Sequence, residues 1–216
     1  MKTLVELFHE NPNHNTTKFI HNLMIYDELF AKYRNTEVSI LEIGILEGGS
    51  LELWETYFGE KAHIYGIDID ITKAHYLNNE SQITMIQGSQ GDREFLRSIK
   101  QIIPKIDILI DDGSHISEHQ IATFEELFPY IDENGIYACE DMHNCWHPSN
   151  TQYNFANYLK KLTDCILGSH KEVSGILATI GHSLSIKSIN FSNNMVTIEK
   201  KNMRTHVKSP IRTGKL

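Results

Sequence analysis

The chain has 216 residues, a length that suits one α/β domain and leaves little room for a second. Hydrophobic residues make up 40% of it and charged residues 22%, a balance that excludes a disordered or low-complexity chain. No apolar run approaches the ~18 residues of a transmembrane helix, and no secretory cleavage site is visible, so we expect no membrane partner. The three cysteines, Cys139, Cys145 and Cys165, form no CxxC pair and predict a reduced, cytoplasmic setting.

Charge is distributed unevenly along the chain. The net charge is −8, and the segment from Lys200 to Leu216 carries six cations and no acid, so subtracting those six leaves −14 for residues 1–199. An acidic body of this kind repels nucleic-acid phosphates, and we expect no nucleic-acid partner. The basic tail is expected to be a solvated, flexible terminus.

Apolar spacing predicts the helices and strands in chain order. Spacings of three and four residues predict a first helix that opens at Thr16-Thr17-Lys18 and ends near Arg34. Apolar runs bounded by glycine, proline or polar residues predict five strands, at 38–44, 64–69, 83–87, 106–112 and 136–140. Helical spacing predicts the helices that follow them, at about 51–58, 93–102, 117–128 and 153–162.

Two local signals complete this prediction. The run Ser117-Glu-His-Gln120, with serine first and glutamine three residues later, predicts a capping box. Two β-rich runs, 183–191 and 195–200, are joined by Ser192-Asn193-Asn194 and predict a hairpin. Because strands that alternate with helices form parallel sheets, we expect a Rossmann-like α/β fold. It would be a seven-stranded, mostly parallel sheet with an antiparallel C-terminal hairpin and N-terminal helices.

The domain organisation expected from the sequence is simple, because no internal repeat or linker is visible. We expect an N-terminal helical extension over residues 1–35, one main domain over 36–203 and a basic tail over 204–216. The amphipathic helix near residues 17–33 offers an interface for a homo-oligomer, whose existence the sequence leaves open.

Polar and ionisable residues gather at the carboxyl ends of the predicted strands. Open α/β sheets bind their ligands at this edge, near the point where the strand order reverses. The strand bodies are apolar by contrast, which separates this edge from an ordinary solvated surface. The strand-end groups are Glu42 to Ser50, Asp68 with Asp70, Gln87 to Ser89, Asp111 to His115, and Glu140 to His143.

A glycine loop and an acid indicate nucleoside binding. The spacing Gly44-x-x-x-Gly48-Gly49 lets the backbone approach a ligand at a helix N-terminus. Leu46 replaces the second glycine of GxGxxG, which disfavours a nicotinamide oxidoreductase, and no GK[ST] end supports a P-loop. Asp68 follows about twenty residues later, where a carboxylate can accept hydrogen bonds from ribose hydroxyls.

Four carboxylates follow the next two strands: Asp111, Asp112, Glu140 and Asp141. Oxygens converging from two loops suit a hard divalent cation such as Mg2+. Such a cation lowers the pKa of bound hydroxyls, and His115 could take up the proton at neutral pH.

Four runs then carry a resemblance to a known family: LEIGILEGGSLELW, GIDID, IDDGSH and EDMHNCW. The chain resembles the metal-dependent class I methyltransferases of the macrolide sugar O-methyltransferase and cephalosporin-hydroxylase-like group, over about residues 38–150. The pairing of DDGSH with ED at the next strand end is the discriminating part, since many methyltransferases share the glycine loop.

The resemblance implies a cofactor, a metal and a role for each strand-end residue. S-adenosylmethionine (SAM) would contact Glu42, Gly44, Gly48, Ser50, Asp68 and Ser89, with Asp111 near its methionine part. Mg2+ or Mn2+ would be held by Asp112, Glu140 and Asp141, and His115 would be the general base.

Two departures from the family bear on the substrate. Where the family often has a Thr-Ser-Tyr-Trp-like stretch, this chain has His143-Asn-Cys-Trp146, and it shows no counterpart of the large N-terminal domain of the macrolide enzymes. We take His143 and Trp146 as candidate substrate residues, because an aromatic ring packs well on the C–H face of a sugar. The alternative for Trp146 is a lid or core anchor.

The expected function is therefore that of a SAM-dependent, Mg2+-dependent O-methyltransferase acting on a sugar or small polyol. The sugar would be free, nucleotide-linked, or part of a surface polysaccharide or natural product. A methyltransferase acting on a non-sugar small molecule is the alternative within the same class.

Other classes of function also fit parts of the sequence. His115-Ile-Ser-Glu-His119 matches the HxxEH pattern of zinc metallohydrolases, although a cap at Ser117 would leave His115 outside the helix. A non-catalytic ligand-binding domain is a second alternative, disfavoured by the intact acids. A hydroxylase is a third, and no clear 2-His-1-carboxylate spacing supports it.

Overall fold

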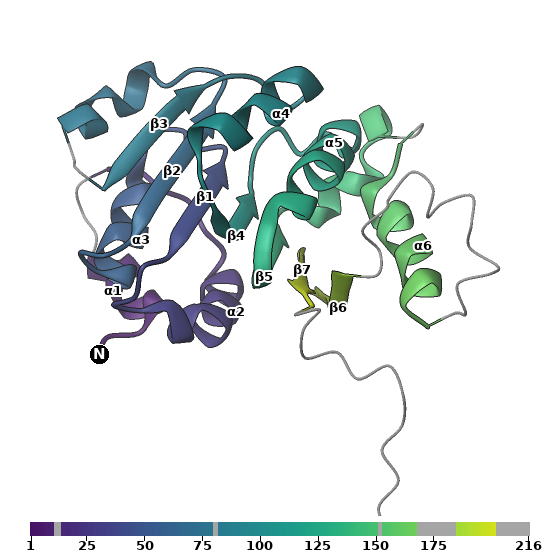
Figure 1. Cartoon of the computed structure of the whole chain (residues 1–216), viewed down its shortest axis with the longest axis horizontal. Helices are drawn as coiled ribbons and strands as arrows, with labels where there is room; N and C mark the ends of the chain where they lie inside the picture. Colours follow the sequence, from purple (N-terminus) through teal and green to yellow (C-terminus); the bar gives the residue numbers. More distant parts are fainter. Residues whose placement is uncertain (11–13, 80–81, 151–152, 168–184, 202–216) are drawn as a thin grey trace, which may run out of the picture.

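The computed structural model describes residues 1–10, 14–79, 82–150, 153–167 and 185–201 (Figure 1). The strands are β1 (Ser39–Ile43), β2 (His63–Asp68), β3 (Ile83–Gln87), β4 (Ile106–Asp111), β5 (Ile131–Cys139), β6 (Ile186–Ser192) and β7 (Met195–Lys200). The α-helices are α1 (Leu4–Glu10), α2 (Ile20–Phe30), α3 (Gly49–Phe58), α4 (Arg93–Ile102), α5 (Ser117–Leu127) and α6 (Phe155–Leu167). Short 3-10 helices are η1 (Ala31–Tyr33), η2 (Thr72–Asn79), η3 (Phe128–Tyr130), η4 (Met142–Trp146) and η5 (Pro148–Asn150).

The described strands form one seven-stranded sheet in the order β3-β2-β1-β4-β5-β7-β6. β1 pairs in parallel with both β2 and β4, and the parallel pairing continues to β3 on one side and β5 on the other. β7 runs antiparallel between β5 and β6, so the C-terminal hairpin extends the sheet beyond β5. The fold predicted from the sequence is thus confirmed. The strand order reverses between β1 and β4, which is the edge where such sheets bind ligands.

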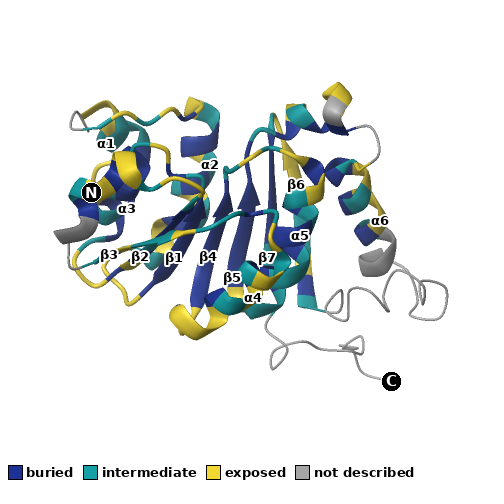
Figure 2. Cartoon of the chain, turned by 90° about the horizontal axis from the view of Figure 1, so that it is seen from above, coloured by how far each residue is buried: buried dark blue, intermediate teal, exposed yellow. Residues whose placement is uncertain are grey.

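The sheet separates two hydrophobic cores, with the buried strands lying between two layers of helices (Figure 2). On one face, α1, α2 and α3 pack Leu4, Tyr26 and Trp54 against the sheet. On the other face, α4, α5 and α6 contribute residues such as Leu96 and Phe124. The helices before β1 therefore share their core with the sheet. The division at residue 35 stays a prediction, and residues 204–216 lie outside the described part.

The start of α2 differs from its prediction. The helix begins at Ile20 rather than at Thr16, and Phe19 before it is extended, with ψ 133°. Apolar spacing could not place this boundary, because it is set by a polar contact: the Lys18 amine reaches acids at the ends of the central strands. The extended segment before α2 consequently lies across the edge of the sheet where the glycine loop begins.

The predicted capping box of α5 is wrong. Ser117 is the first helical residue, Ile116 stands at the N-cap, and no side chain of its own caps the helix. The Ser117 backbone N–H instead donates to Asn150 Oδ1 at 2.9 Å. Because Asn150 lies 33 residues later and is almost fully buried, no local motif could have revealed this cap.

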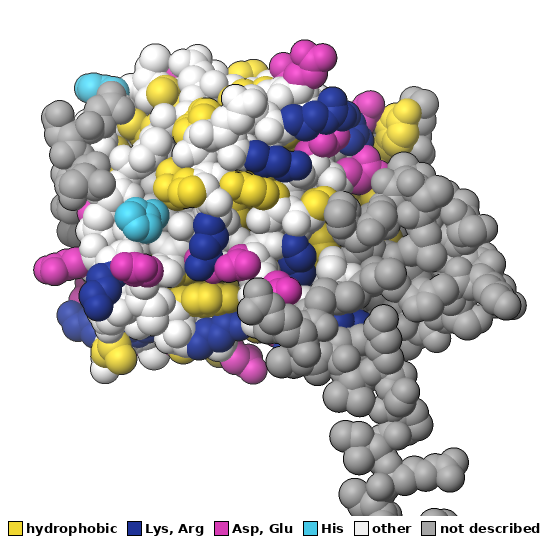
Figure 3. Space-filling view, in the orientation of Figure 1, with side chains coloured by type: hydrophobic (Ala, Val, Ile, Leu, Met, Phe, Trp, Pro, Cys, Tyr) yellow, Lys and Arg dark blue, Asp and Glu magenta, His cyan; other side chains and the backbone are white. Residues whose placement is uncertain are grey.

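The predicted C-terminal hairpin is confirmed over the described residues. Its two strands pair with Ser192 opposite Met195, and the chain turns at residues 193–194. Residues 183 and 184 of the predicted first strand lie outside the described part. Among the described residues, no helix has the length and hydropathy needed to cross a bilayer. On the face shown in Figure 3, the described basic and acidic side chains are interspersed.

Candidate functional site

Two adjoining cavities open at the carboxyl ends of the central strands, with volumes of about 340 and 210 Å3. Both are lined by Gly44, Asp68 and Gly113, so they meet at the reversal point between β1 and β4. The larger cavity, here called the acid-side cavity, is also lined by Asn15 to Phe19, Ile45, Leu46, Ser50, Asp112, His115, Glu140 and Asp141. The smaller, here called the glycine-side cavity, is also lined by Ile43, Ile67, Ile69, Gly88, Ser89, Gln90, Ser114 and His119.

The glycine loop after β1 is shaped by left-handed backbone. Gly44 has φ +89°, and a Cβ at this position would stand 2.2 Å from the backbone oxygen of Asp112. Only glycine lets the β1 and β4 loops approach this closely. Gly48, with φ +84°, is the N-cap of α3. Leu46, where the sequence departs from GxGxxG, is itself left-handed at φ +48°.

Asp68 at the end of β2 stabilises this loop by accepting hydrogen bonds from its backbone. Its Oδ2 accepts backbone N–H bonds from Ile45 and Leu46 at 3.0 and 3.1 Å, and its Oδ1 accepts one from Asp70 at 3.1 Å. A carboxylate has about four acceptor sites, so capacity remains for a ligand in either cavity. The predicted ribose-binding acid is therefore placed at the junction of the two cavities.

The other residues predicted to bind the cofactor divide into two groups. Ser50 lines the acid-side cavity and Ser89 the glycine-side cavity. Glu42 and Asp111 are fully buried and are not among the described lining residues. Asp111 accepts bonds from Gln90 Nε2 at 2.5 Å and from the Tyr137 hydroxyl at 3.1 Å, and burial raises its pKa to about 6.

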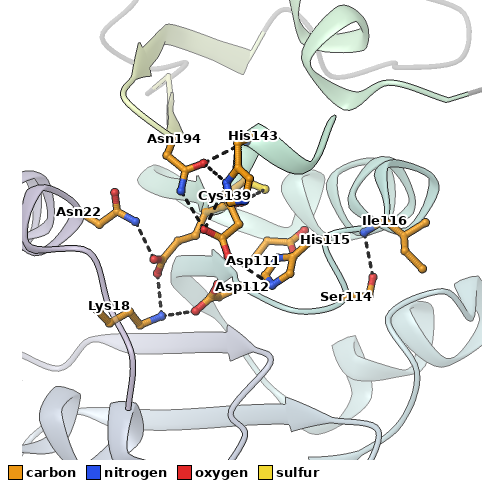
Figure 4. Close-up of polar contacts among 12 residues, drawn as sticks. Lys18, Asn22, Asp111, Asp112, Ser114, His115, Ile116, Cys139, His143 and Asn194 are labelled. Carbon is orange, nitrogen blue, oxygen red and sulfur yellow. Dashed lines mark hydrogen bonds and ion pairs between the residues drawn. The ribbon is translucent and has the colours of Figure 1, made fainter. Parts of the chain in front are cut away.

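Lys18 holds three strand-end acids together. Figure 4 shows its contact with Asp112. Its amine donates to Glu42 Oε1 at 2.9 Å, Asp112 Oδ2 at 2.6 Å and Glu140 Oε1 at 2.7 Å, and only 2% of its side chain is exposed. The second Glu42 oxygen accepts a bond from Trp54 Nε1 at 2.9 Å. This lysine therefore links β1, β4 and β5 from a segment outside the sheet.

Glu140 is further bound by α2. Asn22 Nδ2 donates to its Oε2 at 2.7 Å, and the Tyr26 hydroxyl donates to its Oε1 at 2.8 Å. With the Lys18 bond, three of its roughly four acceptor sites are engaged. The remaining site, on Oε2, is the one that a metal ion could use.

The charges in this cluster are strongly coupled. Burial raises the pKa of Asp112 to about 8, with further contributions from Glu140 and Glu42 and opposition from Lys18. Burial works against the charge of Lys18, but Glu140, Glu42 and Asp112 raise its pKa well above the usual value. The lysine is therefore a buried cation whose charge is stabilised by the three acids around it.

His115 and Asp141 face each other across the acid-side cavity. Both have left-handed backbone, with φ +55° and +52°, and His115 Nε2 lies 3.5 Å from Asp141 Oδ2. One ligand atom each of Asp112, His115 and Asp141 lies within 4.8 Å of the others. Burial lowers the pKa of His115 even though Asp141 and Glu140 oppose this, and its buried Nδ1 has no hydrogen-bond partner among the described residues.

The predicted substrate residues line a third cavity of about 760 Å3 beside the others, here called the outer groove. Trp146 is two-thirds exposed, and His143 hydrogen-bonds through Nδ1 to Asn194. Phe19 lines both the outer groove and the acid-side cavity, which joins the two. The described residues that line it are Phe19, His21, Met142, His143, Trp146, Ala156, Phe191, Ser192, Asn193, Asn194 and Met195.

The geometry does not support the HxxEH alternative. His115 precedes α5 and points to Asp141, whereas His119 lies within the helix with Nδ1 2.9 Å from Ser114 Oγ. The two histidines therefore do not share one helix face, as zinc binding by this motif requires.

Several site residues were not predicted from the sequence: Lys18, Asn22, Tyr26, Gln90, Asn150 and Asn194. The i, i+4 spacing of Asn22 and Tyr26 was a usable signal, because it places two hydrogen-bond donors on one face of α2. Lys18 precedes the helix, so its place beside them could not be read from helical spacing. Asn194 lies in the hairpin turn, and only the strand order shows that this turn lies beside the end of β5.

Comparison with known proteins adds three similarities. The family model described as Rhamnosyl O-methyltransferase/CmcI matches residues 11–154. The chain is 42% identical over 130 residues to mycinamicin VI 2''-O-methyltransferase of Micromonospora griseorubida, covering 57% of this chain and 32% of that protein. It is 30% identical over 189 residues to 8-demethyl-8-alpha-L-rhamnosyl tetracenomycin-C 2'-O-methyltransferase of Streptomyces olivaceus, covering 82% of this chain and 49% of that protein.

Among solved structures, the chain is similar to the MycE methyltransferase in complex with Mg, SAH and mycinamycin VI. The TM-score is 0.76 at 32% identity, and the match covers 93% of this chain and 54% of that chain. The chain thus spans from about a third to about half of the length of these relatives. Because the family model matches more than half of the sequence, the chain belongs to the rhamnosyl O-methyltransferase/CmcI family.

Proposed function

We propose that this chain carries the catalytic site of a SAM-dependent, Mg2+-dependent O-methyltransferase that methylates a sugar hydroxyl. The observation that carries this proposal is the meeting of two cavities at the strand-order reversal, with the glycine loop between them and the acids on one side. Family membership supports it, as does the similarity to MycE, which was solved with Mg and SAH.

SAM fits across the two cavities. Gly44 and Asp68 belong to both, and Ser50 and Ser89 lie one on each side. The N-terminus of α3 directly behind the glycine loop offers backbone N–H groups to a ligand carboxylate. Glu42 and Asp111 would not contact the cofactor. They would instead hold Lys18 and Gln90 in place through their hydrogen bonds.

Mg2+ fits the donor set of the acid-side cavity. Asp112 and Asp141 would hold it, and Glu140 would join them through its remaining Oε2 acceptor site. Oxygen donors from two loops are the ligands that this hard cation prefers. When bound, the ion would orient the acceptor and lower the pKa of its hydroxyl.

His115 would receive the proton of the acceptor hydroxyl. Because its pKa is lowered, the neutral form that can accept a proton is populated at pH 7. Asp141 at 3.5 Å would stabilise the imidazolium that forms. As the hydroxyl oxygen takes the methyl group, its proton would pass to His115, and the thioether product would leave the glycine-side cavity. Alignment of the two reactants would supply much of the rate.

The outer groove favours a sugar that is attached to an apolar group. Phe19, Met142, Trp146 and Phe191 supply an apolar surface, and the described lining contains no Lys or Arg. A nucleotide-linked sugar would bring a diphosphate, which proteins hold with such cations. Lys160 contacts the Trp146 ring from outside this lining, with its amine 5.8 Å from the ring centre.

The location and assembly of the protein belong to the same proposal. We place it in the cytoplasm, because the described cysteine side chains, Cys139 and Cys145, are buried free thiols. A homo-oligomer would use the exposed residues Ile20 and Met24 of α2.

The test is methyl transfer from SAM to a panel of rhamnosyl glycosides with apolar aglycones, compared with nucleotide-linked sugars, each with Mg2+ and with EDTA. We expect a methylated glycoside in the presence of Mg2+ and none with EDTA, as read by mass spectrometry. If methyl groups were transferred only to nucleotide-linked sugars, the proposed acceptor class, a sugar attached to an apolar group, would be wrong. Full activity in EDTA would overturn the role of the metal.

A further inference from the structure

Asn194 binds three consecutive residues at the acid end of β5, although it lies more than fifty positions away in sequence. Figure 4 shows its contacts with His143. Its side-chain Nδ2 donates to Asp141 Oδ1 at 2.8 Å. Its side-chain oxygen accepts a bond from the backbone N–H of His143 at 3.0 Å, and its backbone oxygen accepts one from Met142 at 3.1 Å. One residue of the hairpin turn therefore fixes the chain where the strand-end acids lie.

The orientation of the Asn194 amide follows from chemistry. An ionised carboxylate only accepts hydrogen bonds and a backbone N–H only donates, so the amide nitrogen must face Asp141 and the amide oxygen must face His143. The His143 Nδ1 lies 2.5 Å from the same amide oxygen. That ring nitrogen must therefore carry a proton, which leaves Nε2 of a neutral His143 as a hydrogen-bond acceptor.

The backbone at this point also suits asparagine. Asn194 has φ +62°, a left-handed conformation that asparagine tolerates better than most residues. Cys139 of β5 pairs with Val196 of the antiparallel β7, so the turn before β7 must lie beside the residues that follow β5. The contact between Asn194 and Asp141 is thus set by the sheet register.

We propose that Asn194 is a positioning residue that aims Asp141 at the bound cation and His143 at the acceptor, a role that rests on the function proposed above. With Oδ1 of Asp141 held by Asn194, Oδ2 is turned toward His115 in the acid-side cavity. With Nδ1 of His143 held by Asn194, Nε2 is free to accept a bond from an acceptor hydroxyl in the outer groove. The hairpin turn thereby couples the metal side of the site to acceptor binding.

The experiment compares Asn194→Gly with a control, Asn190→Ala, which removes an exposed amide from β6 of the same hairpin at a position outside the described lining of the outer groove. Glycine keeps the left-handed backbone and removes only the amide. We expect Asn194→Gly to weaken Mg2+ binding about 10- to 100-fold in calorimetric titrations with S-adenosylhomocysteine present, as for other residues that orient metal ligands. The KM for the acceptor should rise, while S-adenosylhomocysteine affinity and Tm stay close to wild type. Asn190→Ala should behave as wild type throughout.

A spectroscopic measurement decides the same question on the wild-type protein. Nitrogen NMR of 15N-labelled histidine at pH 8, with His143 assigned through His143→Gln, should show the Nδ1–H tautomer for His143. In Asn194→Gly the signal should move to the Nε2–H tautomer. A wild-type Nε2–H tautomer, or unchanged Mg2+ affinity and acceptor KM in Asn194→Gly, would overturn the proposal. Failure of the wild-type protein to bind S-adenosylhomocysteine would instead overturn the proposed function.

Discussion

The two sides of the site are supported in different ways. On the glycine side, Asp68 bonds to Ile45 and Leu46, and these contacts join neighbouring strand ends about twenty residues apart. On the acid side, Glu140 is held by Lys18, 122 residues before it. The glycine side is thus built by adjacent crossovers, whereas the acid side is held by both ends of the described chain. A change on one side should therefore leave the other side largely intact.

The largest effect is expected from Asp112→Asn on the acid side. The substitution removes a carboxylate that both the metal and Lys18 require, so methyl transfer should fall below detection while S-adenosylhomocysteine affinity stays within a few-fold of wild type. Asp70→Asn, at an exposed acid after β2, is the control and should keep full activity. Unchanged turnover in Asp112→Asn would show that methyl transfer does not depend on a metal held by this acid.

His115→Asn should lower turnover about 100- to 10,000-fold, the usual contribution of a general base. Asparagine suits the left-handed backbone at this position, so folding should be preserved. Steady-state kinetics with S-adenosylhomocysteine binding as a control would measure the loss. Added imidazole should restore part of the rate, and turnover equal to wild type without it would exclude His115 as the base.

Lys18→Met should lower the free energy of unfolding by about 3–5 kcal/mol, because it leaves two buried carboxylates, Glu42 and Glu140, and the partly buried Asp112 without their cation. Urea denaturation would measure this. Lys2→Met, which breaks an exposed ion pair with Glu10, should cost less than about 1 kcal/mol. If both variants lost the same small amount, the lysine would not hold the acid side together.

Asp68→Asn should have the smallest effect, confined to the glycine side. An amide would replace the carboxylate that accepts bonds from the glycine loop and from a ribose, so S-adenosylhomocysteine affinity should fall about 10- to 100-fold. Calorimetry would show the loss, and Mg2+ affinity should stay close to wild type. A variant that lost Mg2+ binding to the same degree would show that the two sides are not independent.

The sequence predicted most strands well, because they are apolar runs with clear boundaries. β3 and α4 have the predicted limits, and α3 ends at Phe58 as predicted. β5 begins at Ile131 rather than at 136, because the polar residues 132–135 hide the pairing of Ile131 with Ile106. The start predicted for α2 and the cap predicted for α5 were wrong, because they depend on Lys18 and Asn150, whose partners are distant in sequence. Periodicity and capping motifs describe only local interactions, so they could not reveal these contacts.

The strand-end residues of the site could be predicted from the sequence, but the residues that hold them in place could not. Strand-end position brought together Asp112, His115, Glu140 and Asp141, because parallel strands share one carboxyl edge. The buried lysine could not be foreseen, since a lysine near a helix start is normally solvated. Asn194 depended on the pairing of β7 with β5, which no residue pattern specifies.

The most direct test of the nucleoside site, and of the independence of the two sides, is a calorimetric titration of S-adenosylhomocysteine into the wild-type protein, once with Mg2+ and once with EDTA. Because the glycine side is held by its own contacts, we predict binding in the micromolar range under both conditions. If S-adenosylhomocysteine bound when Mg2+ was present but not in EDTA, the two sides of the site would not be independent. The absence of binding under both conditions would contradict the nucleoside site, and with it the proposed methyltransferase.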